Sequence, residues 1–216
     1  VGGRQASLHV YGPEGVATVV EGFNTAYRLD RGYRIAHHGV ELLPPAAGPM
    51  TAQTFEPGVV WQDDTMTVTS FLVDHHPIPP AVGYRFDYKG RSVVISGDTN
   101  ASDNLFAAAE NADVVFHDAL ARRSLDIMRG SMAEAGRPRI AQIVTDVIDY
   151  HADSLTLEDA ANAAGVKQLV LYHLVPTPVN DLTEDMFMRG LSGNNILAHD
   201  LQSFNLPPNS EQIIIR

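Results

Sequence analysis

The chain is organised around one stretch, Arg91-Ser92-Val93-Val94-Ile95-Ser96-Gly97-Asp98-Thr99. A short β-prone run passes directly into Gly-Asp-Thr, which predicts a buried strand that ends abruptly with one carboxylate at its C-terminal tip. Asp98 is therefore a candidate functional residue. The alternative is that Asp98 caps the helix that follows, since Asp is a good N-cap residue. Histidines at the ends of other strands favour the functional role.

Length and composition predict one globular domain over residues 1–216, because the composition is even and the chain is long enough for one sizeable core. No apolar run approaches the roughly 20 residues that a membrane helix needs. The net charge of −11 argues against a broad binding surface for nucleic acid, so no nucleic-acid partner is expected. The chain has no cysteine, so any metal ion must be held by His, Asp or Glu.

The first residues, Val1-Gly2-Gly3-Arg4, include neither an initiator Met nor the charged and apolar regions of a signal peptide. We therefore expect further residues upstream. The location, cytoplasmic or periplasmic, stays open.

A β-hairpin is predicted to bring histidine and Asp98 together. The strand at 66–73 runs into Asp74-His75-His76-Pro77, and the strands at 82–88 and 91–95 are joined by the turn Lys89-Gly90. The two ends of a hairpin lie on the same side, so His75 or His76 can meet Asp98.

Further strands end in polar residues. The strand at 112–116 is followed by His117-Asp118, and the strand at 166–172 delivers His173. His151 opens a polar turn before a helix expected to begin near Thr156. Ligand sites in α/β folds lie at the C-terminal ends of strands, so the order of elements predicts an α/β enzyme.

Other segments are less decisive. A helix is expected from about Gly15 to Phe23, short strands at 27–29 and 33–35, and a surface loop around His37-His38. The mostly helical region 120–150 carries a set of arginines that belong either to a lid or to a solvated face: Arg122, Arg123, Arg129, Arg137 and Arg139.

Several motifs in order resemble the metallo-β-lactamase superfamily, and within it the ribonuclease Z and arylsulfatase-like branch: residues 73–85, 96–99, 116–119, 151 and 169–176. The resemblance covers about residues 8–206. It implies an α/β fold in which two mixed sheets are flanked by helices in an αββα sandwich. It also implies two metal ions, usually zinc (Zn²⁺), and a homodimer.

The resemblance assigns roles to five residues. His75, with His76 as its rival, resembles a metal ligand, Asp98 resembles the carboxylate that bridges two metals, and His173 resembles the last ligand. Asp118 and His151 resemble a catalytic pair. The superfamily's His-x-His-x-Asp-His motif is absent from these 216 residues. By resemblance it belongs upstream of Val1, so the N-terminal part of the fold is expected to be missing.

The predicted function is a metal-dependent hydrolase that cleaves a small ester, such as a sulfate, phosphodiester or carboxylic ester, with water activated by two metals. One alternative is a ribonuclease Z-like transfer RNA 3′-endonuclease, which requires a basic groove formed by the arginines of region 120–150. The other is a metal-free binding module that has lost catalysis.

Overall fold

The computed structural model describes residues 4–192 and 194–216, so the prediction about Val1 to Gly3 lies outside it. The chain packs into two compact units, Val1–Val60 and Trp61–Arg216, which are described separately. The single domain over residues 1–216 stays a prediction. None of the helices in the described ranges is both long enough and apolar enough to cross a lipid bilayer.

The first unit combines a small parallel sheet with two helices. Strands β1 (Leu8–Gly12) and β2 (Met50–Thr54) pair in parallel, and the helical segments between them are α1 (Val16–Ala26), α2 (Arg28–His38) and the 3₁₀ turn η1 (Pro45–Ala47). Helix α1 begins directly after Gly15, as expected. His9, on β1, lies with its Nδ1 2.9 Å from Thr51 Oγ1 of β2.

Helix α2 corrects two sequence predictions. The short strands predicted at 27–29 and 33–35 are wrong, because Tyr27 joins two helices and the other residues belong to α2. The Asp30–Arg34 ion pair, 2.8 Å long and four residues apart, supports the helix. A β-prone triplet is too short to outweigh such i,i+4 contacts. His37 and His38, expected in a loop, form the exposed last turn of α2.

A seven-stranded mixed sheet has the order β3-β4-β5-β6-β7-β8-β9. Neighbours from β4 to β6 pair antiparallel, and those from β6 to β9 pair parallel. This sheet confirms the predicted mixed α/β class. The strands are β3 (Gly58–Gln62), β4 (Met66–Leu72), β5 (Val82–Tyr88), β6 (Arg91–Ile95), β7 (Val114–Leu120), β8 (Gln168–Val175) and β9 (Ile196–Leu197).

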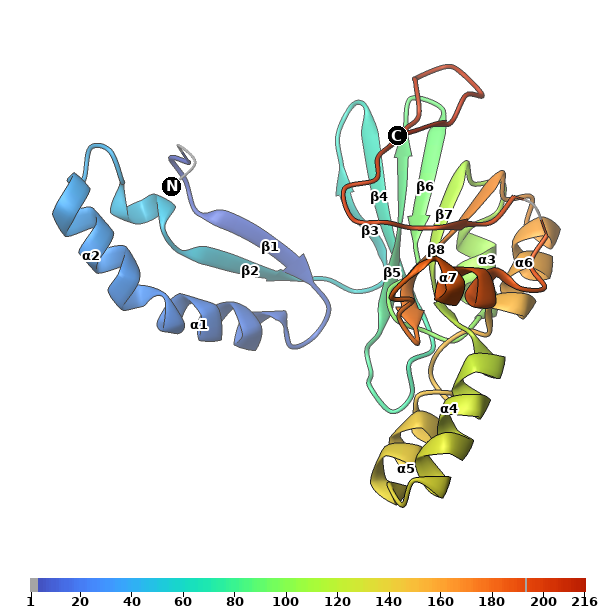
Figure 1. Cartoon of the computed structure of the whole chain (residues 1–216). Helices are drawn as coiled ribbons and strands as arrows, with labels where there is room; N and C mark the ends of the chain where they lie inside the picture. Colours follow the sequence, from blue (N-terminus) through green and yellow to red (C-terminus); the bar gives the residue numbers. More distant parts are fainter. Residues whose placement is uncertain (1–3, 193) are drawn as a thin grey trace. The chain divides into compact units, whose positions relative to one another are not determined.

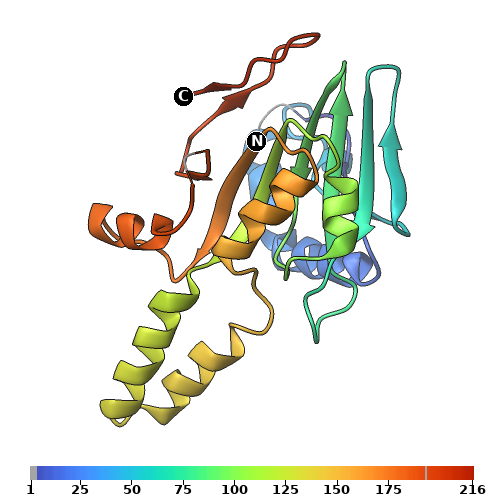
Figure 2. The ribbon, with the colours of Figure 1, turned by 90° about the vertical axis from the view of Figure 1, so that its right-hand side faces the viewer.

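Helices α3 (Asp103–Ala108) and α6 (Ser154–Ala163) lie in front of the sheet in Figure 2. Leu105 of α3 and Leu157 of α6 are fully buried in one cluster with apolar residues of β6, β7 and β8. Ser102 caps α3. Helix α6 starts two residues before the predicted Thr156 and is capped by Asp153. The remaining elements are α7 (Asp181–Met188), β10 (Phe204–Asn205) and β11 (Ile214–Ile215).

A helical hairpin, made of α4 (Arg122–Glu134) and α5 (Pro138–Asp146), projects beyond the end of the sheet in Figures 1 and 2. Its helices pack through a separate small cluster that includes Leu125 and Val144. The hairpin follows β7 directly. Because β6, β7 and β8 run parallel, their C-terminal ends and the base of the hairpin share one edge of the sheet.

Candidate metal centre

Asp98 lies where the backbone turns sharply after β6. The Ser96 amide still donates to Phe116 O at 2.9 Å, and Gly97 then adopts a positive φ of 76°. A Cβ at Gly97 would lie 2.8 Å from Val82 O, so glycine is required at this position. The turn presents the Asp98 carboxylate at the sheet edge, as the sequence predicts.

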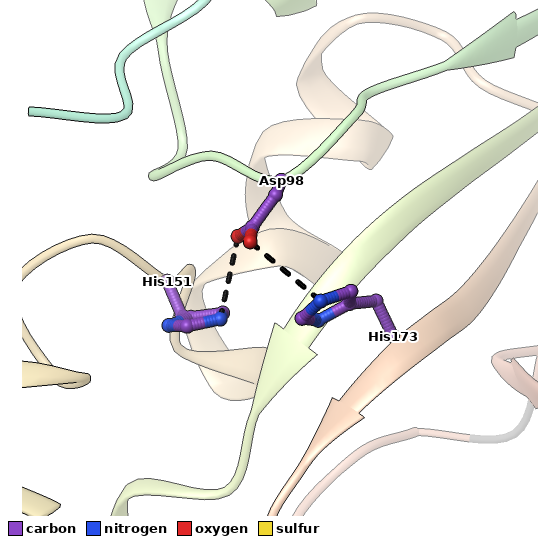
Figure 3. Close-up of side chains that lie close together, drawn as sticks. All are labelled: Asp98, His151 and His173. Atoms are coloured by element: carbon purple, nitrogen blue, oxygen red, sulfur yellow. Dashed lines mark ion pairs between the residues drawn. The ribbon is translucent and has the colours of Figure 1, made fainter. Parts of the chain in front are cut away.

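Three imidazoles face this carboxylate. His75 Nε2 and His173 Nε2 lie 3.2 and 3.6 Å from Asp98 Oδ2, and His151 Nε2 lies 3.3 Å from Oδ1. Figure 3 shows His151 and His173 on either side of Asp98. His75, and not its exposed neighbour His76, is the residue that the predicted hairpin brings to Asp98.

A β-bulge directs His173 toward the site. Asp118 pairs with Tyr172 and Ala119 pairs with Leu174, so His173 is the extra residue of β8. Its φ of 45° is uncommon for a residue other than glycine. The bulge re-aims the side chain, and no signal in the sequence predicts it.

Thr99 connects the loop of His75 to the loop of Asp98. Its buried hydroxyl accepts a hydrogen bond from the Asp74 amide at 2.9 Å and donates to Asp74 O at 3.0 Å. Asp74 precedes His75 and Thr99 follows Asp98, so this contact fixes the two side chains relative to each other. Sequence reasoning missed this role, since Thr99 looked only like the end of a turn.

Asp118, predicted to be catalytic, is completely buried, and its carboxylate accepts hydrogen bonds from backbone amides. Its Oδ1 accepts from the Thr99 amide at 3.3 Å and its Oδ2 from the Ala152 amide at 3.4 Å. The ring of His151 instead bonds through Nδ1 to Val147 O at 2.7 Å. Asp118 therefore positions the loops that carry Asp98 and His151. Within the described residues, no hydrogen bond or ion pair joins its carboxylate to the His151 ring.

Two further rings, the buried His117 and the half-buried Tyr172, contact residues of the loops around Asp98. His117 stacks on Phe106, and its Nδ1 lies 3.1 Å from Asp118 Oδ1. The Tyr172 hydroxyl donates to Gly97 O at 3.1 Å. Burial raises the pKa of Tyr172, and the nearby Asp118 and Asp98 carboxylates add to this effect. Tyr172 thus remains a hydrogen-bond donor that supports the turn before Asp98.

The donor atoms suit a divalent cation. Asp98 Oδ1 is buried and accepts no hydrogen bond from any residue in the described part of the chain. The nearest candidate ligand atoms of Asp98, His151 and His173 all lie within 4.8 Å of one another. Because a carbonyl oxygen can only accept, His151 Nδ1 donates to Val147 O, and Nε2 is the ring nitrogen that faces Asp98. Imidazole nitrogens with a carboxylate oxygen are a donor set that zinc prefers.

Comparison with known proteins gives a consistent family. Residues 2–174 match the model of the Beta-lactamase superfamily domain. A ribonuclease Z of Mycobacterium tuberculosis (strain ATCC 25618 / H37Rv) is 37% identical over 171 residues, which are 79% of this chain and 58% of that protein. A ribonuclease Z of Mycolicibacterium gilvum (strain PYR-GCK) is 34% identical over 170 residues, or 79% of this chain and 54% of that protein. The chain thus spans little more than half the length of these relatives.

A solved structure supports the fold. The metallo-beta-lactamase fold protein YhfI from Bacillus subtilis aligns with a TM-score of 0.56 at 18% identity, covering 90% of this chain and 63% of that one. This likeness concerns the fold alone. It agrees with the mixed sheet and its flanking helices.

The relatives correct one prediction. The sequence argued for a small-molecule ester as partner and against nucleic acid, and the similarity to proteins named ribonuclease Z contradicts this. The physical reason is that net charge sums over the whole chain, whereas binding of a polyanion depends on the charges near the contact surface. The arylsulfatase-like assignment and the homodimer stay untested predictions.

Proposed function

The chain belongs to the beta-lactamase superfamily as one of its hydrolases, and from that premise we propose that it cleaves a phosphodiester bond of RNA with the help of a bound divalent metal ion. The specific form proposed is a ribonuclease of the ribonuclease Z type, with a precursor transfer RNA as the substrate to be tested first. Zinc is the proposed metal.

One observation carries the proposal: a buried, unbonded carboxylate oxygen of Asp98 lies among three imidazole nitrogens, in a chain 37% identical to a ribonuclease Z. Buried polar atoms without partners are costly, so a site that leaves Asp98 Oδ1 unsatisfied in the protein alone favours a ligand there. A cation would satisfy this oxygen together with the nitrogen lone pairs of His75 and His173.

The proposed ligands are His75, Asp98 and His173, as the resemblance implies. A metal ion bound there supplies positive charge that stabilises the negative charge developing on the phosphate oxygens. Asp98 offers its carboxylate at the sheet edge, and His75 is held against it by the Thr99 contact to Asp74. The second metal ion predicted from the sequence is part of the proposal, and Asp98 would help to hold it.

The proposed proton donor is His151. Hydrolysis adds a water oxygen to phosphorus and breaks a phosphorus–oxygen bond, and the departing oxygen needs a proton. His151 Nδ1 is bonded to Val147 O, so the proton to be transferred must be held at Nε2, which lies on the Asp98 side of the ring. Asp118 acts indirectly, because its two oxygens hold the amides beside Asp98 and His151.

The first test is cleavage of a precursor transfer RNA transcript by wild type and Asp98→Asn protein in the presence of Zn²⁺ or Mn²⁺. We expect the substitution to lower the cleavage rate by roughly 100-fold or more, since it removes the anionic ligand. Asp64→Asn, at an exposed turn, makes the same chemical change away from the site and is expected to keep wild-type activity.

The other outcomes are informative. Cleavage that persists in Asp98→Asn would place the activity elsewhere. Hydrolysis of bis(p-nitrophenyl) phosphate without cleavage of RNA would replace the RNA substrate by a small phosphodiester. Absence of both hydrolysis and metal binding would favour the metal-free binding module.

A further inference from the structure

The α4–α5 hairpin differs in charge from the rest of the molecule. Residues 122–146 contain five arginines and three acidic residues, which gives this segment a net charge of +2. The whole chain carries −11, so the other residues together carry −13. A local excess of cations in an acidic chain calls for a physical reason. Arginine in particular matches phosphate, because its planar guanidinium donates two parallel hydrogen bonds.

Hydrogen bonds connect both ends of the hairpin to the segments that form the candidate metal centre. The Leu120 amide donates to Ala152 O at 2.7 Å, and Leu120 also forms a parallel bridge with Asp153. These contacts close the base of the hairpin between Asp118 on β7 and His151 after α5. The Asn100 side chain, two residues after Asp98, donates to Asp149 O at 2.6 Å. Hydrogen bonds therefore connect the base of the hairpin to the loops that carry Asp98 and His151.

Three hairpin arginines are free to bind a ligand. Arg129 pairs with Asp126 at 3.1 Å within α4, and Arg122 lies 4.0 Å from Asp153. Arg123, Arg137 and Arg139 are exposed, and none of them has an ion-pair partner among residues 4–192 and 194–216. Their positive charges face solvent, and no described acidic residue neutralises them.

The free arginines lie at both ends of the hairpin. Arg123 belongs to the first turn of α4, next to the base, whereas Arg137 and Arg139 lie at the start of α5, at the tip in Figures 1 and 2. A 13-residue helix spans about 20 Å at 1.5 Å per residue. The apolar cluster around Leu125 and Val144 fixes the two helices against each other. The cations are thus spread along a rigid arm that starts beside the site.

We propose that the α4–α5 hairpin binds the phosphate backbone of the RNA outside the cleavage site, with Arg123, Arg137 and Arg139 as the phosphate ligands. The inference rests on the proposed function for its substrate class. The hairpin supplies binding energy and register, while the scissile phosphate lies at the Asp98 cluster. Phosphate contacts of this kind position a nucleic acid without reading its sequence.

The test compares two double variants with the same change of charge. Arg137→Glu/Arg139→Glu alters the hairpin tip. Lys89→Glu/Arg216→Glu alters exposed residues in the turn between β5 and β6 and at the C-terminus, outside the hairpin. Binding of a labelled precursor transfer RNA transcript is measured by fluorescence anisotropy over a range of salt concentrations. We expect the dissociation constant to rise roughly tenfold or more for the hairpin variant, and the slope of log affinity against log salt to fall by about 1.5. The control variant should change both much less.

A second readout separates this proposal from the proposed function. Hydrolysis of bis(p-nitrophenyl) phosphate should be unchanged in Arg137→Glu/Arg139→Glu, because this substrate is too short to reach the hairpin. Asp98→Asn should show the opposite pattern: it should bind the RNA but not cleave it. If RNA is bound through the hairpin but not cleaved by wild type, the proposed function fails and the hairpin proposal stands.

Three results would overturn the hairpin proposal. The first is no measurable binding of the transcript by wild type. The second is equal loss of binding in the hairpin and control variants, which indicates general electrostatics. The third is binding to anionic phosphatidylserine vesicles that is lost in the hairpin variant while RNA binding persists. That result would assign the arginines, with exposed Ile127, Ile140 and Ile143, to a membrane surface. Thermal unfolding of each variant shows whether a loss reflects unfolding.

Discussion

His151 is the residue whose role the geometry tests most directly. Its Nε2 is as close to Asp98 as the Nε2 atoms of the proposed ligands His75 and His173 are, although we propose His151 as the proton donor. The two roles differ in what the residue does to metal content. A ligand affects both binding of the ion and activity, whereas a proton donor affects activity alone.

We predict that His151→Gln keeps the metal content of wild type and lowers the rate of RNA cleavage by roughly 10² to 10⁴-fold, the usual contribution of a general acid. The measurements are metal analysis of the dialysed protein and kcat for RNA cleavage. His173→Gln serves as the comparison and should lower metal content.

Equal metal loss in His151→Gln and His173→Gln would make His151 a ligand. His199→Gln controls for the loss of an imidazole, because His199 is exposed and lies 3.9 Å from Glu184 instead of in the cluster. It should retain both metal and activity.

Strands β6 and β7 are joined at their N-terminal ends by a buried ion pair, at the opposite end from the candidate metal centre. Arg91 Nε lies 3.0 Å from Asp113 Oδ2, and Lys167 Nζ lies 3.0 Å from Oδ1. Arg91 also donates to Gln212 O at 2.9 Å and to Ser210 O, which ties the C-terminal segment to the sheet. The pair thus stabilises the scaffold that holds the site.

The charge state of Asp113 follows from this network. Burial alone would raise the pKa of Asp113, but hydrogen bonds from the Ser92 amide, Arg91 and Lys167 outweigh burial and hold the pKa below its usual value. The stabilisation that results is complete above the unfolded-state pKa, about 3.9. It is lost as the pH falls through the lower folded-state pKa.

We predict that Asp113→Ala lowers the free energy of unfolding by roughly 3–5 kcal/mol at neutral pH, because Arg91 is then buried without its partner. Urea unfolding measures the change. For Asp113→Asn, the difference in stability from wild type should shrink as the pH falls below about 4. A difference that stays constant down to pH 2 would contradict the assigned pKa shift. Asp64→Asn, at a solvent-exposed turn, is the matched control and should be nearly neutral.

For the molecule as a whole, a bound metal ion is expected to stabilise the second unit. All four residues of the cluster belong to Trp61–Arg216, and the single tryptophan of the chain, Trp61, is the first residue of that unit. Tryptophan fluorescence therefore reports on the part of the chain that would bind the ion.

We predict that Zn²⁺ at one hundred times its dissociation constant stabilises the fold by about 2.7 kcal/mol, which corresponds to a rise in Tm of about 5–10 °C. A chelator should reverse the rise. Asp98→Asn should show no rise, since the carboxylate ligand is missing. A Tm that responds equally in both proteins would indicate metal binding outside the cluster.

Much of this arrangement could be predicted from local patterns. The run from Arg91 to Ile95 and the glycine after it predicted a strand that presents Asp98, and the short Lys89-Gly90 turn predicted a hairpin that brings His75 near. These features depend on residues close in sequence, where period and turn chemistry decide the structure. The prediction failed where the signal was weakest, in the triplets at 27–29 and 33–35 that form part of a helix.

The sequence by itself therefore determined the mixed α/β class, the family resemblance and the candidate residues His75, Asp98, Asp118, His151 and His173. Only the tertiary structure decided how they meet: the bulge that turns His173, the Thr99 contact that fixes His75, and the buried Asp118 that holds two loops. It also decided that the arginines of the hairpin start beside the site. The physical reason is that strand pairing and burial depend on contacts between residues far apart in the chain, and no local pattern encodes those.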